Sequence, residues 1–180
     1  MSATIDRLMD AAENAIRLRG YHAVSFRELA DELGIKSASV HYHFRQKEDL
    51  GLALVKRYSE RFFQALEARA AKAITPEEKL AAFCEIYRNS LKSSDKVCLC
   101  GLLGAETGGL PDVLSHAVAA FFEANIQWVA QALPEAISQD VRRAKAVQVV
   151  ATLQGAMMLA INLKDLTVFD AAASRLDTDR

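Results

Sequence analysis

The stretch SFRELADELGIKSASVHYHFRQKEDL, residues 25–50, has the pattern of two short helices joined by a tight turn, with a third helix beginning at its end. Ser25 and Glu28 form a capping-box pattern, which satisfies free backbone amides at a helix start. Gly34 stands where a left-handed residue can end that helix, and Ser37 can cap the next one. The stretch therefore predicts a helix-turn-helix, a motif whose second helix lies in the major groove of DNA.

Apolar residues at helical spacing continue on both sides of this motif. An amphipathic helix is expected over residues 4–18 and a long one over residues 47–73, and Thr75-Pro76-Glu77-Glu78 predicts a new helix start. Further helical segments are expected at residues 98–106, 112–133, 139–163 and 166–176. The chain is predicted to be all-α. A three-helix helix-turn-helix DNA-binding domain is expected at residues 1–46, and a helical ligand-binding and dimerisation domain at residues 47–180.

The composition indicates a globular protein of the cytoplasm. Apolar residues make up 51% of the 180, which is ample for a core, and three prolines and eight glycines leave little room for disorder. No uninterrupted apolar run reaches the roughly 18 residues of a membrane span. The N-terminal residues lack the layout of a signal peptide. Three cysteines, an odd number, argue against a disulfide framework and favour reduced thiols.

The charge is distributed unevenly, although the net charge of the chain is only −1. Residues 34–58 hold five basic and two acidic residues, a net charge of +3, whereas residues 59–180 hold 13 basic and 15 acidic residues, a net charge of −2. A local basic patch on a nearly neutral body suits a protein that touches phosphates through one small face.

Position in the motif singles out the side chains that would contact DNA. The residues near the N-terminal part of the second helix can reach base edges; they are Lys36, Ser37, Ser39 and His41. Tyr42 and Lys47 are expected to contact phosphates, and the free amides at the next helix start would assist Lys47.

The segment GIKSASVHYHFRQKEDL resembles the recognition-helix signature of the TetR family of transcriptional repressors, and SFRELADELG resembles the family's second helix. The strong resemblance covers about the first third of the chain. It implies an all-helical regulator, and it implies that Arg27 reaches a base or a phosphate. At His41 the family usually has Tyr, so this chain departs from the pattern there.

A single helix-turn-helix reads only a short half-site, so specific binding requires a two-fold dimer with recognition helices about 34–36 Å apart. The family resemblance also implies a homodimer. The expected interface comes from the apolar helix near residues 139–163 and from the last helix. Its candidate residues are Val147, Val150, Ala151, Gln154, Gly155, Met158, Ile161, Leu166, Phe169, Ala173 and Leu176.

The middle helices are rich in large apolar residues. In the TetR family the equivalent region often encloses a pocket for a small inducer, and an apolar cavity with a few polar groups is the general form of a ligand site. The candidate ligand-binding residues are Phe62, Phe83, Tyr87, Leu103, Trp128, Gln154 and Met157. For any one of these residues taken alone, ordinary core packing is the better explanation.

The segment VCLCGLLGAETGGLP resembles a segment of a TetR subgroup that places a cysteine at the start of this helix. Cys98 holds that position and Cys100 adds a second thiol. A cysteine in the first turn of a helix has a lowered pKa, which favours a sensor of electrophiles or oxidants. The alternative is that both are small buried hydrophobic residues. The Cys98-x-Cys100 spacing, with His116 distant, matches no known zinc site, so no metal is expected.

The sequence thus predicts a repressor that binds a palindromic double-stranded DNA operator as a homodimer and is released by a small-molecule inducer. No cofactor, membrane partner or enzymatic activity is expected, because the chain lacks a Gly-rich phosphate loop and a G-x-S-x-G elbow. Three alternatives remain: a constitutive DNA-binding regulator without effector, a thiol-based sensing repressor, and an enzyme or ligand carrier that only resembles a regulator.

Overall fold

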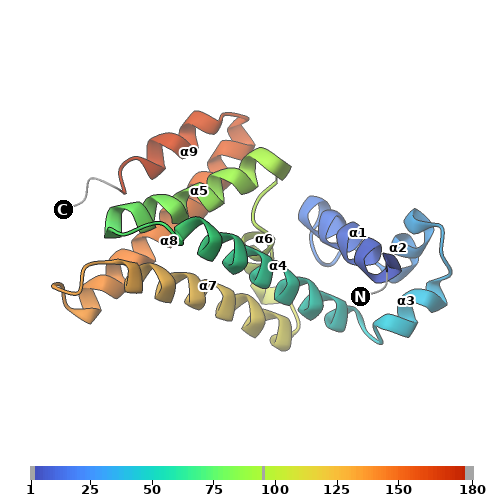
Figure 1. Cartoon of the computed structure of the whole chain (residues 1–180). Helices are drawn as coiled ribbons and strands as arrows, with labels where there is room; N and C mark the ends of the chain where they lie inside the picture. Colours follow the sequence, from blue (N-terminus) through green and yellow to red (C-terminus); the bar gives the residue numbers. More distant parts are fainter. Residues whose placement is uncertain (1–2, 95, 177–180) are drawn as a thin grey trace. The chain divides into compact units, whose positions relative to one another are not determined.

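The computed structural model describes residues 3–94 and 96–176, and these residues form nine α-helices, one short 3-10 helix and no strand (Figure 1). The elements are α1 (Ala3–Arg19), α2 (Phe26–Leu33), α3 (Ser37–His43), α4 (Lys47–Ala70), α5 (Pro76–Ser94), α6 (Leu99–Ala105), η1 (Thr107–Gly109), α7 (Asp112–Ala132), α8 (Gln139–Leu163) and α9 (Leu166–Ala173). The predicted all-α class is confirmed, and the expected helices differ from these by a few residues at their ends.

The chain divides into two compact units, which we call the head and the body. The head contains the described residues up to Ser59 together with Leu99–Ala119, and the body contains Glu60–Cys98 and the described residues from Ala120 onward. Helices α4 and α7 each contribute residues to both units. The single domain boundary expected after residue 46 stays a prediction.

The head is built on contacts of α1 with α2 and α6 and of α2 with α3. Its core consists of aliphatic side chains from these helices and from the first half of α4, which the helical spacing of the sequence places on inward faces. They include Leu8, Ile16, Leu29, Val40, Leu50 and Leu54.

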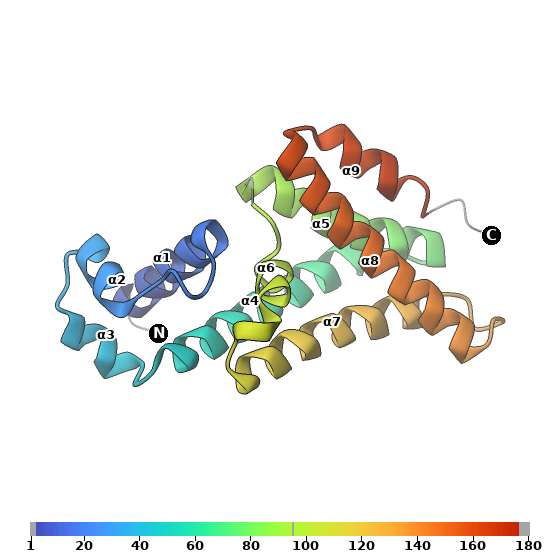
Figure 2. The same cartoon turned by 180° about the vertical axis from the view of Figure 1, so that it is seen from behind.

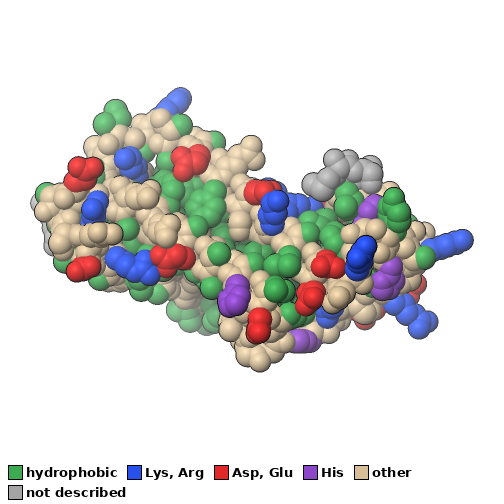
Figure 3. All heavy atoms as spheres, turned by 90° about the horizontal axis from the view of Figure 1, so that it is seen from below, with side chains coloured by type: hydrophobic (Ala, Val, Ile, Leu, Met, Phe, Trp, Pro, Cys, Tyr) green, Lys and Arg blue, Asp and Glu red, His purple; other side chains and the backbone are tan. Residues whose placement is uncertain are grey.

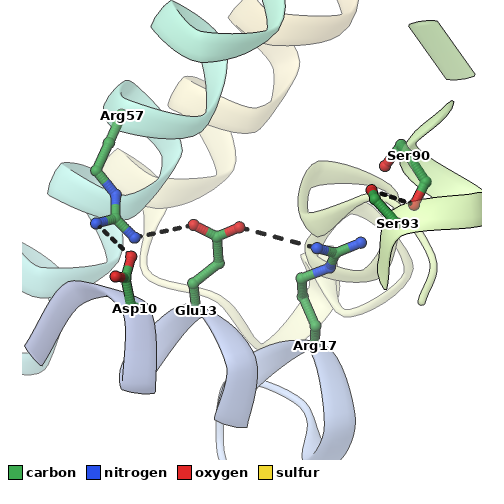
Figure 4. Close-up of polar contacts among 6 residues, drawn as sticks. All are labelled: Asp10, Glu13, Arg17, Arg57, Ser90 and Ser93. Atoms are coloured by element: carbon green, nitrogen blue, oxygen red, sulfur yellow. Dashed lines mark hydrogen bonds and ion pairs between the residues drawn. The ribbon is translucent and has the colours of Figure 1, made fainter. Parts of the chain in front are cut away.

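A network of charges joins α1 to α4 within the head (Figure 4). The Arg57 guanidinium lies 2.9 Å from Asp10 Oδ1 and donates to Glu13 Oε2 at 3.0 Å. Glu13 also pairs with Arg17 at 3.9 Å. The Glu13 carboxylate is largely buried, and the guanidinium groups of Arg57 and Arg17 compensate its charge there.

The body is organised around α8, which packs on α5 and α9, while α5 also packs on α9 (Figure 2). Its centre is a cluster of aromatic rings. The Phe62 ring meets those of Phe83, Tyr87 and Phe121 edge to face at centroid distances of 5.3–6.2 Å, and Trp128 stacks on Phe83 at 5.6 Å. Such pairs add to the stabilisation that burial alone provides.

Helix α8 buries one side and exposes apolar side chains on another. By length and hydropathy alone α8 could cross a membrane, but core helices of soluble proteins meet the same criterion. The exposed apolar side chains include Val147, Met158 and Leu159. Of the expected interface residues, Val150 and Phe169 are instead buried within the body, so the prediction that they face a partner is wrong.

Helix α9 is tied to α5 by an ion pair and begins with a side-chain cap. Arg88 on α5 donates two hydrogen bonds to Asp170 on α9, at 2.6 and 2.8 Å. These bonds, and the positive charges of Arg88 and Lys92, lower the pKa of the Asp170 carboxyl from its ordinary value. Asp165 caps the start of α9 by accepting from the Thr167 amide at 2.9 Å.

Candidate nucleic-acid interface

Helix α2 begins and ends as its sequence predicts. The Glu28 amide donates to Ser25 Oγ at 3.2 Å, and the Glu28 carboxylate accepts from the Ser25 amide at 2.9 Å, so the capping box is confirmed. The hydrogen bonds from Ser25, its hydroxyl first, lower the pKa of Glu28. Gly34 adopts φ +66°, and its amide donates to the carbonyls of Ala30 and Asp31. This left-handed residue turns the chain into α3.

Helix α3 differs from the expectation at both ends. The residue before the helix is Lys36, in extended conformation, and no side chain caps the helix start, so the expectation that Ser37 is the cap is wrong. Ser37 is instead the first helical residue, because the Lys36 carbonyl accepts from the Ser39 amide at 2.8 Å. The helix ends at His43, and Phe44 returns to extended backbone with its ring buried.

Most of the side chains expected to contact DNA are accessible. Arg27, Lys36, His41 and Tyr42 are exposed, whereas Ser37 and Ser39 are half-buried. Tyr42 is 85% exposed, which is unusual for so large an aromatic residue and favours a contact surface. The His41 ring meets the Phe26 ring edge to face at 5.0 Å, which orients it. Figure 3 shows histidine and basic side chains, interspersed with acidic ones, on this part of the head.

A hollow of about 420 Å³ lies between the start of α1 and α3. It brings together three of the predicted contacts, Lys36, Ser39 and Tyr42, and adds Thr4, Ala38 and His43. Thr4 was missed by sequence reasoning because nothing local indicates that the start of α1 approaches α3.

Lys47, at the start of α4, is engaged within the head. Its ammonium donates to the His22 carbonyl at 3.3 Å and lies 4.4 Å from the centroid of the Tyr21 ring. Burial lowers the pKa of Lys47, and the nearby carboxylates of Glu106 and Glu28 oppose this effect. Lys47 therefore holds α4 to the turn after α1, and its role as a phosphate contact stays a prediction.

Glu106 ties the segment after α6 to the same turn. Its carboxylate accepts from the Tyr21 amide at 2.9 Å. Gly20 adopts φ +85°, a left-handed conformation that favours glycine, and a Cβ there would press against the Glu106 carboxylate and displace it. Sequence reasoning missed Glu106 because its partner is 85 residues away. The only local signal was its place in the unusual segment VCLCGLLGAETGGLP.

Six of the seven candidate ligand residues lie in the body, and several of them are linked. Tyr87 Oη donates to Asn125 Oδ1 at 3.2 Å and accepts from Gln154 Nε2 at 3.2 Å. Trp128 Nε1 donates to Glu67 Oε1 at 2.8 Å. Asn125, which is fully buried, was missed by sequence reasoning. The remaining members of the set in the body are Phe62, Phe83 and Met157, all buried.

The seventh candidate ligand residue and the two candidate thiols are also buried. Leu103 lies on α6, in the head. Cys98 is 2% exposed and Cys100 is 0% exposed, and this burial favours the alternative that they act as small hydrophobic residues. Over residues 3–94 and 96–176, no group of three or more His, Cys, Asp or Glu side chains could hold a metal ion. The ligand and thiol assignments stay predictions.

Comparison with known proteins places the chain in a family. Residues 8–54 match the model described as bacterial regulatory proteins, tetR family, and residues 76–175 match the C-terminal domain of LmrA/YxaF-like transcriptional regulators. The transcriptional regulator AcuR of Cereibacter sphaeroides is 30% identical over 121 residues, which cover 66% of this chain and 55% of AcuR. The aligned region therefore spans only about half of that relative.

Solved structures agree in fold over nearly the whole chain. A TetR transcriptional regulator from Legionella pneumophila is 28% identical, with a TM-score of 0.91 and coverage of 98% of this chain and 97% of that one. A TetR-family regulator from Agrobacterium tumefaciens is 27% identical, with a TM-score of 0.88 and coverage of 96% and 94%. The chain belongs to the TetR family of bacterial transcriptional regulators, with a C-terminal domain of the LmrA/YxaF-like type.

Proposed function

We propose that this protein is a cytoplasmic transcriptional repressor that binds a palindromic operator as a homodimer and is released by a small-molecule inducer. The observation that carries the proposal is the surface of α3. His41 and Tyr42 on this helix, and Lys36 just before it, present an imidazole, a phenol and an ammonium group to solvent. Such side chains on a second helix can reach base edges and phosphates.

The exposed apolar face of α8 supports the homodimer. Val147 is 43% exposed and Met158 is 51% exposed, with the small exposed residues Ala151 and Gly155 between them. These four positions recur every three or four residues and so share one face of the helix. A second copy of the same helix would cover this face in an isologous interface, and the two heads would then address two half-sites.

Release by an inducer requires two states of the dimer. One state fits the operator and the other does not. A ligand releases the DNA only if its affinity for the second state is higher than its affinity for the first. A constitutive regulator is the second candidate, because the aromatic side chains expected to line a pocket are packed against one another.

Titration of the DNA upstream of this gene, followed by fluorescence anisotropy, tests the proposal. We expect specific binding of two protomers, with loss of affinity in Tyr42→Ala. The matched control is Lys72→Ala, an exposed body residue, which should bind as the parent does. A folded protein that shows no preference for any upstream site would contradict the DNA-binding role.

The assembly is tested separately. Met158→Glu places a charge on the exposed face of α8 and should give a monomer in sedimentation experiments, with loss of operator binding. Retained specific binding by a monomeric variant would contradict the homodimer mechanism. Release of the operator by candidate metabolites then separates the inducible repressor from the constitutive one.

A further inference from the structure

A second hollow, of about 490 Å³, lies in the body away from the aromatic cluster. It is formed by the start of α5, the end of α7, the turn between α7 and α8, and the early turns of α8. Among its lining residues are Leu80, Leu133, Ile137, Lys145, Gln148 and Val149. Its volume falls within the range of small-molecule sites, about 300–1,000 Å³.

The walls of this distal pocket, as we call it, are mainly hydrocarbon. Leu80 and Val149 are 7% and 5% exposed, so they belong to the body's core and provide a firm apolar surface. Leu133 and Ile137 are half-buried and add further apolar surface. These four side chains form an apolar surface against which the hydrocarbon part of a ligand can pack.

The polar groups of the distal pocket select the charge of the ligand. Lys145 is half-buried and has no ion-pair partner in the described part of the chain, and the amide of Gln148 lies one turn further along α8. Glu77 also lines the pocket, but it is exposed, so water and salt screen its charge. The less screened charge belongs to Lys145, and an anion is therefore favoured over an amine.

We propose that the distal pocket binds an apolar carboxylic acid, with its hydrocarbon part against Leu80 and Val149 and its carboxylate accepting from the Lys145 ammonium and the Gln148 amide. A single ammonium matches a single negative charge, whereas a phosphate group would remain poorly compensated. Binding itself is independent of the proposed repressor function; the role of this pocket as the inducer site rests on that function.

Calorimetric titration with three probes tests the binding. Decanoate, decanol and decylammonium share the same hydrocarbon chain and differ in the head group. We expect decanoate to bind about tenfold more tightly than decanol, the effect of one charge-assisted hydrogen bond, and decylammonium to bind most weakly. Equal affinity for decanoate and decanol, or no binding of decanoate, would overturn the proposal.

Variants locate the probe. Lys145→Gln should remove the preference for decanoate over decanol, while Lys72→Gln, an exposed lysine outside the pocket, should keep it. Val149→Trp should fill the hollow and abolish binding; if its thermal unfolding shows a damaged fold, Ile137→Trp, on the half-buried turn, serves instead. Unchanged binding of decanoate in a folded cavity-filling variant would place the probe elsewhere and overturn the assignment.

A measurement of operator release distinguishes ligand binding in the distal pocket from the inducer role of that pocket. Decanoate should lower the operator affinity of the parent, and Lys145→Gln should need about tenfold more decanoate for the same release. If decanoate binds but the operator is not released, the ligand site stands and its role as the inducer site is refuted. Failure of the unliganded protein to bind any operator would instead remove the proposed function, while calorimetry would still decide whether the site exists.

Discussion

The head exposes the polar groups that are expected to act, whereas the body buries its central ones. In the head, the groups expected to act lie on the surface, and charged contacts such as Arg57 with Glu13 and Tyr21 with Glu106 hold the helices that carry them. In the body, the hydroxyl of Tyr87 and the amide of Asn125 are buried and hydrogen-bonded to each other. Substitutions on the exposed face of α3 should therefore reduce operator binding without reducing stability, whereas substitutions in the aromatic cluster of the body should reduce stability first.

The largest effect should come from the aromatic cluster. Phe83→Ala removes a side chain that is 0% exposed and leaves a cavity among Phe62, Tyr87 and Trp128, so we expect the free energy of unfolding to fall by about 3–5 kcal/mol. Urea denaturation measures this. Tyr42→Ala, on the exposed face of α3, is the matched control in the head and should change stability by no more than about 0.5 kcal/mol. A similar loss in the free energy of unfolding for Phe83→Ala and Tyr42→Ala would contradict the contrast between the body and the head.

Removing the carboxylate of Glu106 should have the next largest effect. Glu106→Ala leaves the Tyr21 amide without its acceptor in a partly buried position, which costs about 1–3 kcal/mol of stability. Because the same turn supports α1 and α4, operator affinity should fall as well. Glu106→Gln keeps an acceptor oxygen and should retain most of both. Equal behaviour of the two variants would show that the hydrogen bond is unimportant.

Two lysines distinguish a side chain that contacts DNA from one that stabilises the head. Lys36→Ala should lower the slope of log affinity against log salt by about 0.9 for each phosphate that Lys36 neutralises, and it should leave stability unchanged, because Lys36 is exposed. Lys47→Ala should reduce stability too, since its ammonium binds the His22 carbonyl. Salt titrations of operator binding, with thermal unfolding of both variants, measure the difference. If Lys36→Ala were destabilised and Lys47→Ala were not, the structural role would belong to Lys36 and not to Lys47.

The smallest effect should come from the ion pair between α5 and α9. The pKa of Asp170 is lowered in the folded protein, so its contribution is present at pH values above its unfolded pKa and is lost as the pH falls through its folded pKa. Asp170→Asn should cost no more than about 1 kcal/mol at neutral pH, because the pair is partly exposed. The difference from the parent should shrink as the pH falls below the ordinary Asp pKa and vanish once the Asp170 carboxyl is protonated in the folded protein. A difference that persists in acid would contradict this origin.

Local signals explain which features the sequence predicted well. The cap at Ser25, the left-handed Gly34 and the restart at Pro76 depend on residues within one turn of each other, so helix positions could be predicted from them. The bond from Tyr21 to Glu106 and the buried Asn125 depend on residues brought together only by folding. The distal pocket is also of this kind, since its walls come from α5, α7 and α8.

Trp128 gives the body a built-in optical reporter. It is the only tryptophan of the chain, it belongs to the body, and it stacks on Phe83 while its indole N–H binds Glu67. Indole emission depends on the polarity around the ring, so the emission spectrum reports the body alone. A change in emission that precedes the loss of helical circular dichroism would therefore identify loosening of the body without any added dye.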